Sequence, residues 1–295
     1  MKLKKLNIYD QKIFNDIVKY GRLNSESSFA NLFIWSDIYN TQYAIIDEML
    51  CVFYTSDSGI LKCIYPFGNG DIKKVITNIR DNVYNGQKSF VMTAVCEDDK
   101  TVLEREFGNK VTFEYDRDSS EYVYLSYKLS TLSGKKLHAK RNHINKFMSK
   151  YKYTYKKLEP TIFDDCIQST EKWMDIKYQG DRGAYEKELS TIKKAFKYFN
   201  ELSLSGGAIY VDEKLVAYCV GEQLNCDTAV VHIEKADADY PGSFSIINRD
   251  YVINRWNNIK YINREEDLGI EGLRKAKLSY CPEFLIDKYI ATFNF

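Results

Sequence analysis

The sequence has no excess of one charge, since 42 lysine and arginine residues face 41 aspartate and glutamate residues over 295 positions. This balance argues against a uniformly basic nucleic-acid-binding protein. No window approaches the roughly 18 uninterrupted apolar residues that span a bilayer, and the N-terminal residues lack the apolar core of a signal peptide. We therefore expect a cytoplasmic protein without a transmembrane segment, and its length predicts about two domains.

Motifs for metals, nucleotides and common hydrolases are also missing. The seven cysteines include no Cys-x-x-Cys pair, and the three histidines form no His-Glu-x-x-His motif, which predicts neither a disulfide framework nor a metal site. Gly68-Asn69-Gly70 lacks the third glycine of a dinucleotide fingerprint, and there is no P-loop or Gly-x-Ser-x-Gly elbow. Hydride transfer, ATP hydrolysis and triad hydrolysis therefore have no support.

Hydrophobic periodicity predicts the same order of elements in each half of the chain. The first half has two short helices, then a hairpin (43–54), a strand (61–65), a helix (72–83), a strand (89–95), a helix (100–107) and a strand (111–115). The second half has two helices (163–202), then a meander (208–234), a helix (246–251), a strand (261–262), a helix (270–278) and a strand (284–293). We interpret this order as a duplicated α/β unit, with an N-terminal domain over 1–120 and a C-terminal domain over 121–295 that bears the active site. The turn into the central helix of such a unit is a place where backbone N–H groups could hold a pyrophosphate or an activated acyl group.

Basic residues are concentrated in one segment. Between Ser133 and Leu158 there are nine lysines and arginines and no acidic residue. Apolar residues at helical spacing predict one helix with a narrow apolar stripe and a strongly basic remainder. The alternative is a solvated surface, but like charges this dense repel one another, which favours a polyphosphate partner, either RNA backbone or anionic lipid head groups. The phosphate-binding candidates in this segment are Lys135, Lys136, Lys140 and Arg141.

One candidate for proton transfer lies on the last strand of the predicted meander. Within Val230–Lys235, alternation places His232 and Glu234 on one face and Val231 and Ile233 on the other. A histidine beside a carboxylate is a reasonable proton-transfer pair. The alternative is a histidine whose hydrogen bonds are satisfied inside a half-buried sheet.

A second charged group follows the next predicted strand, where α/β folds often place reactive side chains. Glu265, Glu266 and Asp267 are candidate proton acceptors because adjacent carboxylates raise one another's pKa, and Arg264 could counter one of them. An acidic turn that caps the following helix is the alternative. On that helix Arg274, Lys275 and Lys277 are phosphate-binding candidates, or else its solvent-exposed face.

Several of these segments resemble the family named for the C-terminal domain of phosphatidylglycerol lysyltransferase. The segments that carry the resemblance are Ser28–Trp35, Leu132–His143, His232–Ala236, Tyr261–Gly269 and Gly272–Lys277. The resemblance covers essentially the whole chain and is most specific at the last two segments. It implies an α/β (α+β) fold of two tandem GNAT-like acyltransferase domains, each a mixed, mostly antiparallel sheet flanked by helices.

The resemblance also implies a function. We expect transfer of an aminoacyl group from aminoacyl-tRNA to a phosphatidylglycerol-like lipid or another acceptor, with tRNA and anionic phospholipid head groups as partners and no DNA. We expect no permanently bound cofactor, and the co-substrate is aminoacyl-tRNA or acyl-CoA. The membrane enzymes carry an N-terminal multispan region that this sequence lacks, so a soluble acceptor stands beside the lipid, and peripheral membrane attachment replaces insertion. Two alternatives remain, an acyl-CoA-dependent N-acetyltransferase and a non-catalytic protein that binds tRNA or anionic lipid.

Overall fold

The computed structural model describes residues 2–18, 22–177 and 182–295, which form two compact units. The first unit comprises Met1–Glu121, Glu266–Gly269 and Ile286–Phe295, and the second comprises Tyr122–Glu265 and Ile270–Leu285. The chain therefore passes between the units several times, whereas the predicted domains have a single boundary after residue 120. The reason is that the last strand pairs with two strands of the first unit.

The first unit is built on a seven-stranded sheet with the order β1-β2-β3-β4-β5-β14-β6. Its strands are β1 Lys4–Lys5, β2 Gln42–Ile46, β3 Met49–Thr55, β4 Leu61–Ile64, β5 Ser89–Cys96, β6 Val111–Tyr115 and β14 Lys288–Asn294. β2 and β3 form the predicted hairpin, and Asp47 and Glu48 at its turn both have positive φ. β4 then pairs parallel to β5. The meander is therefore followed by a parallel strand.

Four α-helices accompany this sheet in the described residues: α1 Gln11–Ile17, α2 Phe29–Ile34, α3 Ile72–Asn82 and α4 Glu97–Phe107. α3 has the predicted amphipathic spacing, since Ile72, Val75, Ile76 and Ile79 are all buried. It begins after Asp71, whose carboxylate accepts hydrogen bonds from two backbone N–H groups of the first turn. This cap explains why the helix starts directly after the Pro66–Gly70 turn.

The second unit repeats the same plan with the strand order β13-β7-β12-β11-β10-β9-β8. Its strands are β7 Glu121–Leu125, β8 Tyr153–Lys157, β9 Ser205–Val211, β10 Lys214–Gln223, β11 Thr228–Ala236, β12 Tyr261–Asn263 and β13 Phe284–Ile286. Its helices are α5 Ser126–Thr131, α6 His138–Lys150, α7 Phe163–Lys177, α8 Arg182–Lys197, α9 Ser243–Arg255 and α10 Glu271–Leu278. An antiparallel meander, β9-β10-β11, is again followed by a parallel strand, β12.

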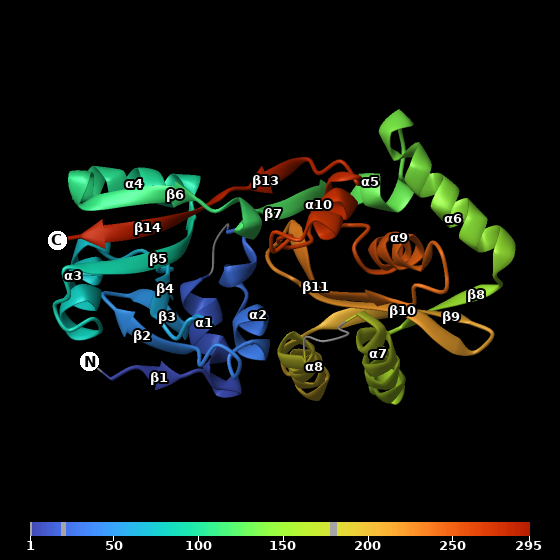
Figure 1. Ribbon diagram of the computed structural model, residues 1–295, viewed down its shortest axis with the longest axis horizontal. Helices are drawn as coiled ribbons and strands as arrows, with labels where there is room; N and C mark the ends of the chain where they lie inside the picture. Colours follow the sequence, from blue (N-terminus) through green and yellow to red (C-terminus); the bar gives the residue numbers. More distant parts are fainter. Residues whose placement is uncertain (1, 19–21, 178–181) are drawn as a thin grey trace. The chain divides into compact units, whose positions relative to one another are not determined.

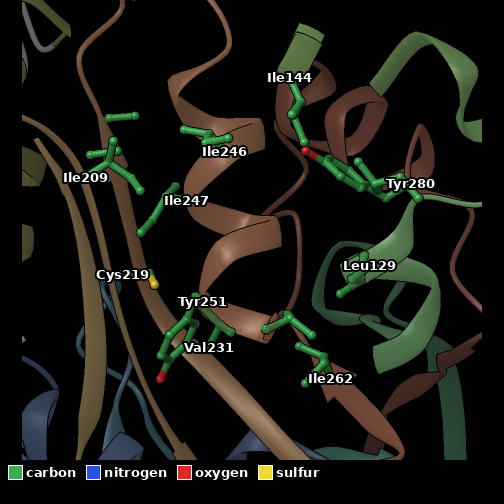
Figure 2. Close-up of a cluster of buried hydrophobic side chains, with 14 of the residues drawn as sticks. Leu129, Ile144, Ile209, Cys219, Val231, Ile246, Ile247, Tyr251, Ile262 and Tyr280 are labelled. Atoms are coloured by element: carbon green, nitrogen blue, oxygen red, sulfur yellow. The ribbon is translucent and has the colours of Figure 1, made fainter. Parts of the chain in front are cut away.

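The helices of the second unit lie on both faces of its sheet. In Figure 1, α7 and α8 lie on one side of β9–β11, while α6 and α9 lie on the other. Figure 2 shows Ile246, Ile247 and Tyr251 of α9 among the side chains of the sheet, with Ile144 of α6 and Tyr280 nearby. All of these side chains are buried, so α9 is the central helix of this core.

Two predicted elements are wrong in extent. The basic segment is not one helix, because α6 ends at Lys150 and the chain continues as β8, which pairs with β9. Tyr153 and Tyr155 alternate with exposed or half-exposed residues and pack on the core, and this period of two overrides the helical spacing. The final strand predicted over 284–293 is divided between β13 and β14, which belong to different sheets.

Candidate active site

In the sheet of the second unit, the parallel strands β11 and β12 pair over a few residues only. The rest of β11 therefore has no strand beside it on the β12 side. Only Thr228–Val230 pair with β12, whereas β11 continues to Ala236. Opposite β10 the register steps from Val231 to Ile233, so His232 is an extra residue in a β-bulge. A Cβ atom at Gly221 would lie 2.2 Å from the carbonyl oxygen of Val230, so this position of β10 needs glycine. The predicted residues His232 and Glu234 therefore lie where β11 has no β12 neighbour.

His232 is held between two carboxylates. Its Nδ1 is 2.7 Å from Oε1 of Glu265, and its Nε2 is 3.1 Å from Oε1 of Glu222. Burial alone lowers the pKa of His232, but hydrogen bonds with Glu222 and Glu265 outweigh it and raise the pKa from 6.5 to about 10. The ring is therefore an imidazolium that donates from both nitrogens at neutral pH. In this form the ring donates to both carboxylates, which favours Glu265 among the predicted proton acceptors.

Glu234 has a different partner, Arg264. Nη2 of Arg264 donates to both carboxylate oxygens, at 2.9 and 3.1 Å, and Nδ2 of Asn248 donates to one of them at 3.3 Å. The guanidinium carbon lies 5.0 Å from the ring centroid of Tyr280 and 5.7 Å from that of Tyr124. The two predicted strand residues are thus not a pair with each other, but each contacts one residue of the predicted loop.

Lys277 holds the backbone of that loop. Its Nζ donates to the carbonyl oxygens of Arg264 at 2.5 Å and Glu265 at 3.0 Å. Glu265 has a positive φ of 56°, and its own N–H donates to Oδ1 of Asn263 at 2.8 Å. Lys277 is only 7% exposed, so its ammonium holds the loop in place. It does not lie on a solvent-exposed face of the helix, where a phosphate was predicted to bind.

The other two basic candidates of α10 differ from Lys277. Lys275 is exposed and forms an ion pair of 2.6 Å with Glu271 one turn earlier. Arg274 is half-buried on the same helix. The ion pair of Lys275 lies within α10 itself.

Glu266 and Asp267 belong to the first unit. Asp267 is fully buried, forms an ion pair of 3.3 Å with Arg117 and accepts a hydrogen bond from the N–H of Gly269. Glu266 is half-buried; burial lowers the pKa of Lys288, but the charges of Glu121, Glu26 and Glu266 together raise it. The predicted acidic loop is therefore divided, and Glu265 is its carboxylate in the site of the second unit.

Of the basic candidates near α6, Lys140 reaches this site. Its Nζ lies 4.1 Å above the ring centroid of Tyr280, and burial followed by the charge of Arg264 lowers its pKa. Arg141 instead donates to the carbonyl oxygens of Leu132 and Gly134, which closes the end of α5. Lys135 and Lys136 are exposed.

Four residues of the site were absent from the sequence prediction: Glu222, Asn248, Tyr124 and Tyr280. Glu222 carried a usable signal, because it is a lone carboxylate near the end of the apolar strand β10. Asn248 is a polar residue on the apolar face of α9 and is 3% exposed. The two tyrosines resemble other core tyrosines in the sequence and gave no such signal.

The start of α9 is where the fold would offer N–H groups to a pyrophosphate. A Cβ atom at Gly242 would lie 2.9 Å from the carbonyl oxygen of His143 in α6, and Ser243 is 2% exposed. Gly242 has a φ of 101°, a backbone conformation that favours glycine. α6 therefore packs closely against the start of α9.

Residues 18–292 match the family described as phosphatidylglycerol lysyltransferase, C-terminal. The chain belongs to this family. A conserved protein of unknown function from Bacteroides thetaiotaomicron is 35% identical, with complete coverage of both chains and a TM-score of 0.94. An uncharacterised protein of Mycoplasmoides gallisepticum is 30% identical over 206 residues, which cover 68% of this chain and 65% of the relative.

More distant structures show the fold. L-PGS from Bacillus licheniformis is 13% identical over 99% of this chain and 93% of that chain, with a TM-score of 0.69. A tandem GNAT protein from the clavulanic acid biosynthesis pathway is 9% identical over 99% and 98% of the two chains, with a TM-score of 0.53. The predicted fold class, two tandem GNAT-like domains, is confirmed. In the described residues, no helix combines the length and apolar character needed to cross a membrane.

Proposed function

We propose that this member of the family transfers an aminoacyl group from aminoacyl-tRNA to a hydroxyl or amine acceptor. Family and fold already indicate a GNAT-like acyltransferase domain. The observation that carries the finer proposal is the Arg264–Glu265 loop. Lys277 fixes its backbone, and the loop places a guanidinium and a carboxylate side by side against the unpaired end of β11.

The chemistry needs few groups because the aminoacyl ester is already activated. The acceptor oxygen or nitrogen attacks the ester carbonyl carbon, and the bond from that carbon to the ribose oxygen breaks. The acceptor proton moves to Glu265 and then to the ribose oxygen, which leaves as a hydroxyl. In this mechanism the rate enhancement comes mainly from holding the two substrates in position and from a carboxylate within reach of the proton. His232, itself held by Glu222, is a positioning residue for Glu265.

Two features favour aminoacyl-tRNA over acyl-CoA as the donor. α6 packs closely against the start of α9, which leaves little room for a pyrophosphate. Exposed lysines extend from Lys135 and Lys136 through α6 to the edge strand β8, with no acidic residue among them. Such a surface suits an RNA backbone.

The acceptor is the less determined half of the proposal. The family description names a phosphatidylglycerol lysyltransferase, and the similar protein from Bacillus licheniformis is called L-PGS. We therefore place a phosphatidylglycerol-like lipid first and a soluble hydroxyl or amine compound second. The same loop would serve either acceptor, because each loses one proton in the reaction.

A donor and acceptor matrix tests the function. The purified chain is incubated with tRNA charged with labelled lysine or alanine, or with labelled acetyl-CoA, and with phosphatidylglycerol vesicles or small amines. We expect label to move only from a charged tRNA to one of the acceptors. Transfer from acetyl-CoA alone would select the N-acetyltransferase alternative, and tight tRNA binding without transfer would select the non-catalytic one.

A further inference from the structure

Left-handed backbone conformations are concentrated in the loop that carries Glu265. Glu265, Leu268 and Gly269 have φ values of 56°, 54° and 71°, so this conformation occurs three times within residues 265–269. Glu265 and Leu268 carry side chains that disfavour it. Such a backbone persists only where the surrounding contacts determine it, and it is most frequent at functional sites. The contacts that fix this loop are therefore candidates for a role in the reaction.

The start of the loop is held within the second unit. The N–H of Tyr122 donates to the carbonyl oxygen of Glu265 at 3.2 Å, and the N–H of Arg264 donates to the carbonyl oxygen of Tyr122 at 3.0 Å. Nζ of Lys277 donates to the carbonyl oxygens of Arg264 and Glu265. These bonds fix the backbone as far as the carbonyl group of Glu265, and the chain that follows needs another anchor.

Asp267 is the anchor on the other side, within the first unit. Its carboxylate is fully buried: Nη1 of Arg117 donates to Oδ2 at 3.3 Å, and the N–H of Gly269 donates to Oδ1 at 2.9 Å. The N–H of Leu268 donates to the carbonyl oxygen of Asp118 at 3.1 Å. The turn with two left-handed residues is thus tied to the segment that contains Arg117 and Asp118.

We propose that Asp267 is a positioning residue for Glu265 and is not itself the proton acceptor. Only Glu266 separates the two residues, so the direction of the chain after Glu265 depends on where Asp267 is held. Because Asp267 is buried, it acts through the backbone of the loop. This assignment rests on the proposed function, in which Glu265 takes the acceptor proton, and it adds a residue of the first unit to those that the reaction needs.

His232 reports the position of Glu265 without any substrate. Burial lowers the pKa of His232, but the hydrogen bonds and charges of Glu222 and Glu265 raise it to about 10. If Asp267→Asn lets Glu265 move away from the ring, this pKa should fall by about one unit or more, because one of two opposite charges is lost. NMR titration of the full chain measures it, and the other two histidines, both exposed on α6, serve as internal references.

The same substitution should lower kcat for transfer by about 10- to 100-fold and leave KM nearly unchanged, because a misplaced catalytic group slows the chemical step more than binding. Asp99→Asn is the matched control. Asp99 is also buried in the first unit, pairs with Arg22 and accepts a hydrogen bond from the N–H of Cys96 before α4. It lies outside the loop, so kcat and the pKa of His232 should keep their wild-type values.

Gly269→Ala disturbs the same turn without removing a charge. A Cβ atom there would lie 2.6 Å from Oδ2 of Asp118 at a φ of 71°, so the turn must shift. We expect a smaller change in the same direction in both measurements. Gly59→Ala, at a φ of 78° with open space around its Cβ, is the matched control for the backbone conformation alone. This second pair keeps the test decisive if Asp267→Asn does not fold.

The positioning role and the function fail in different ways. A folded Asp267→Asn variant that equals Asp99→Asn in both kcat and the pKa of His232 would overturn the role of Asp267. A lower pKa of His232 in Asp267→Asn, without transfer from any charged tRNA by the wild type, would support the positioning of Glu265 and reject the function. Transfer by the wild type and by Asp267→Asn at equal rates, with an unchanged pKa, would support the function and reject the positioning role.

Discussion

Each unit places a buried cation between two glutamates, but among the described residues only the cluster of the first unit has no unpaired buried polar atom beside it, and we call it the closed cluster. In the first unit Nζ of Lys288 lies 2.5 Å from carboxylate oxygens of both Glu26 and Glu121, and Glu121 also accepts hydrogen bonds from the backbone and hydroxyl of Ser25. The side chains of Lys288 and Glu121 are 1% and 0% exposed, and that of Glu26 is 22% exposed. In the described part of the chain, none of these three side chains has a buried atom without a hydrogen-bond partner.

The cluster of the second unit has the same charges, and we call it the open cluster because buried atoms without a hydrogen-bond partner adjoin it. Its cation is His232, whose side chain is 1% exposed. The side chains of Glu222 and Glu265 are 15% and 18% exposed. Orphan atoms of Asn248 and Arg264 lie on the adjoining Glu234 group. This comparison leads us to assign stability to the cluster whose surroundings are fully paired, and the proposed chemistry to the cluster that adjoins unpaired atoms.

The largest stability effect should come from the closed cluster. Lys288→Met leaves the buried Glu121 and the half-buried Glu26 without their cation, and we expect the free energy of unfolding to fall by about 3 to 5 kcal/mol. Urea denaturation followed by circular dichroism measures it. Lys275→Met, at an exposed ion pair, is the control with almost no change. A loss below about 1 kcal/mol in Lys288→Met would show that the cluster is not a stabilising one.

The pH dependence of stability reports on the cluster of the second unit. The pKa of His232 is raised from 6.5 to about 10 in the folded chain, so its contribution is complete below pH 6.5 and is lost as pH rises toward 10. The difference in unfolding free energy between the wild type and His232→Asn should shrink by at most about 1.4 kcal/mol per pH unit over this window. Chemical denaturation at pH 7 and pH 9.5 measures it. A difference that stays constant or grows with pH would contradict the imidazolium.

Lys277 tests how far the open cluster depends on the backbone of its loop, because the ammonium of Lys277 holds that backbone. Lys277→Met leaves the carbonyl oxygens of Arg264 and Glu265 without this donor, and we expect a loss of about 1 to 3 kcal/mol in stability. The transfer rate should fall further than stability explains, since Glu265 loses its position. Rates measured at a temperature where the variant is fully folded separate the two effects. An unchanged rate there would show that the loop needs no support.

The smallest effects belong to the exposed basic surface. Lys135→Gln with Lys136→Gln should leave stability unchanged and weaken tRNA binding a few-fold, and the salt slope of binding should fall by roughly 1.4 to 1.8 for two lost phosphate contacts. Lys73→Gln with Lys74→Gln on α3 is the matched control. Filter binding at several salt concentrations measures the slope. Equal slopes in the two double variants would exclude Lys135 and Lys136 from the RNA surface.

The sequence predicts the parts whose signals are local. The hairpin of β2 and β3 and the amphipathic helix α3 follow from residue spacing, and the charged loop at the exit of β12 follows from a run of ionisable residues. Glu265, Arg264, His232 and Glu234 were all among the predicted site residues. What brings them together is the separation of β11 from β12, which needs the fold.

The remaining features depend on contacts between residues far apart in the chain. Lys288 starts a strand that pairs with β5 and β6, and no periodicity in residues 284–293 indicates a change of sheet. Tyr151, Tyr153 and Tyr155 fit a period of two as well as Ile144, Met148 and Tyr151 fit a helix, so spacing alone could not place the end of α6. Glu222 lies ten residues from His232 but meets it because β10 and β11 pair.

The most direct test of the account compares one glutamate from each cluster in single-turnover transfer from charged tRNA. Glu265→Gln keeps the shape of the side chain but cannot take the acceptor proton, so we expect its rate to fall by about 10²- to 10⁴-fold. Glu26→Gln, in the closed cluster, should keep the wild-type rate at a temperature where its melting curve shows it folded. A rate for Glu265→Gln equal to that of Glu26→Gln would contradict the assignment of catalysis to the open cluster.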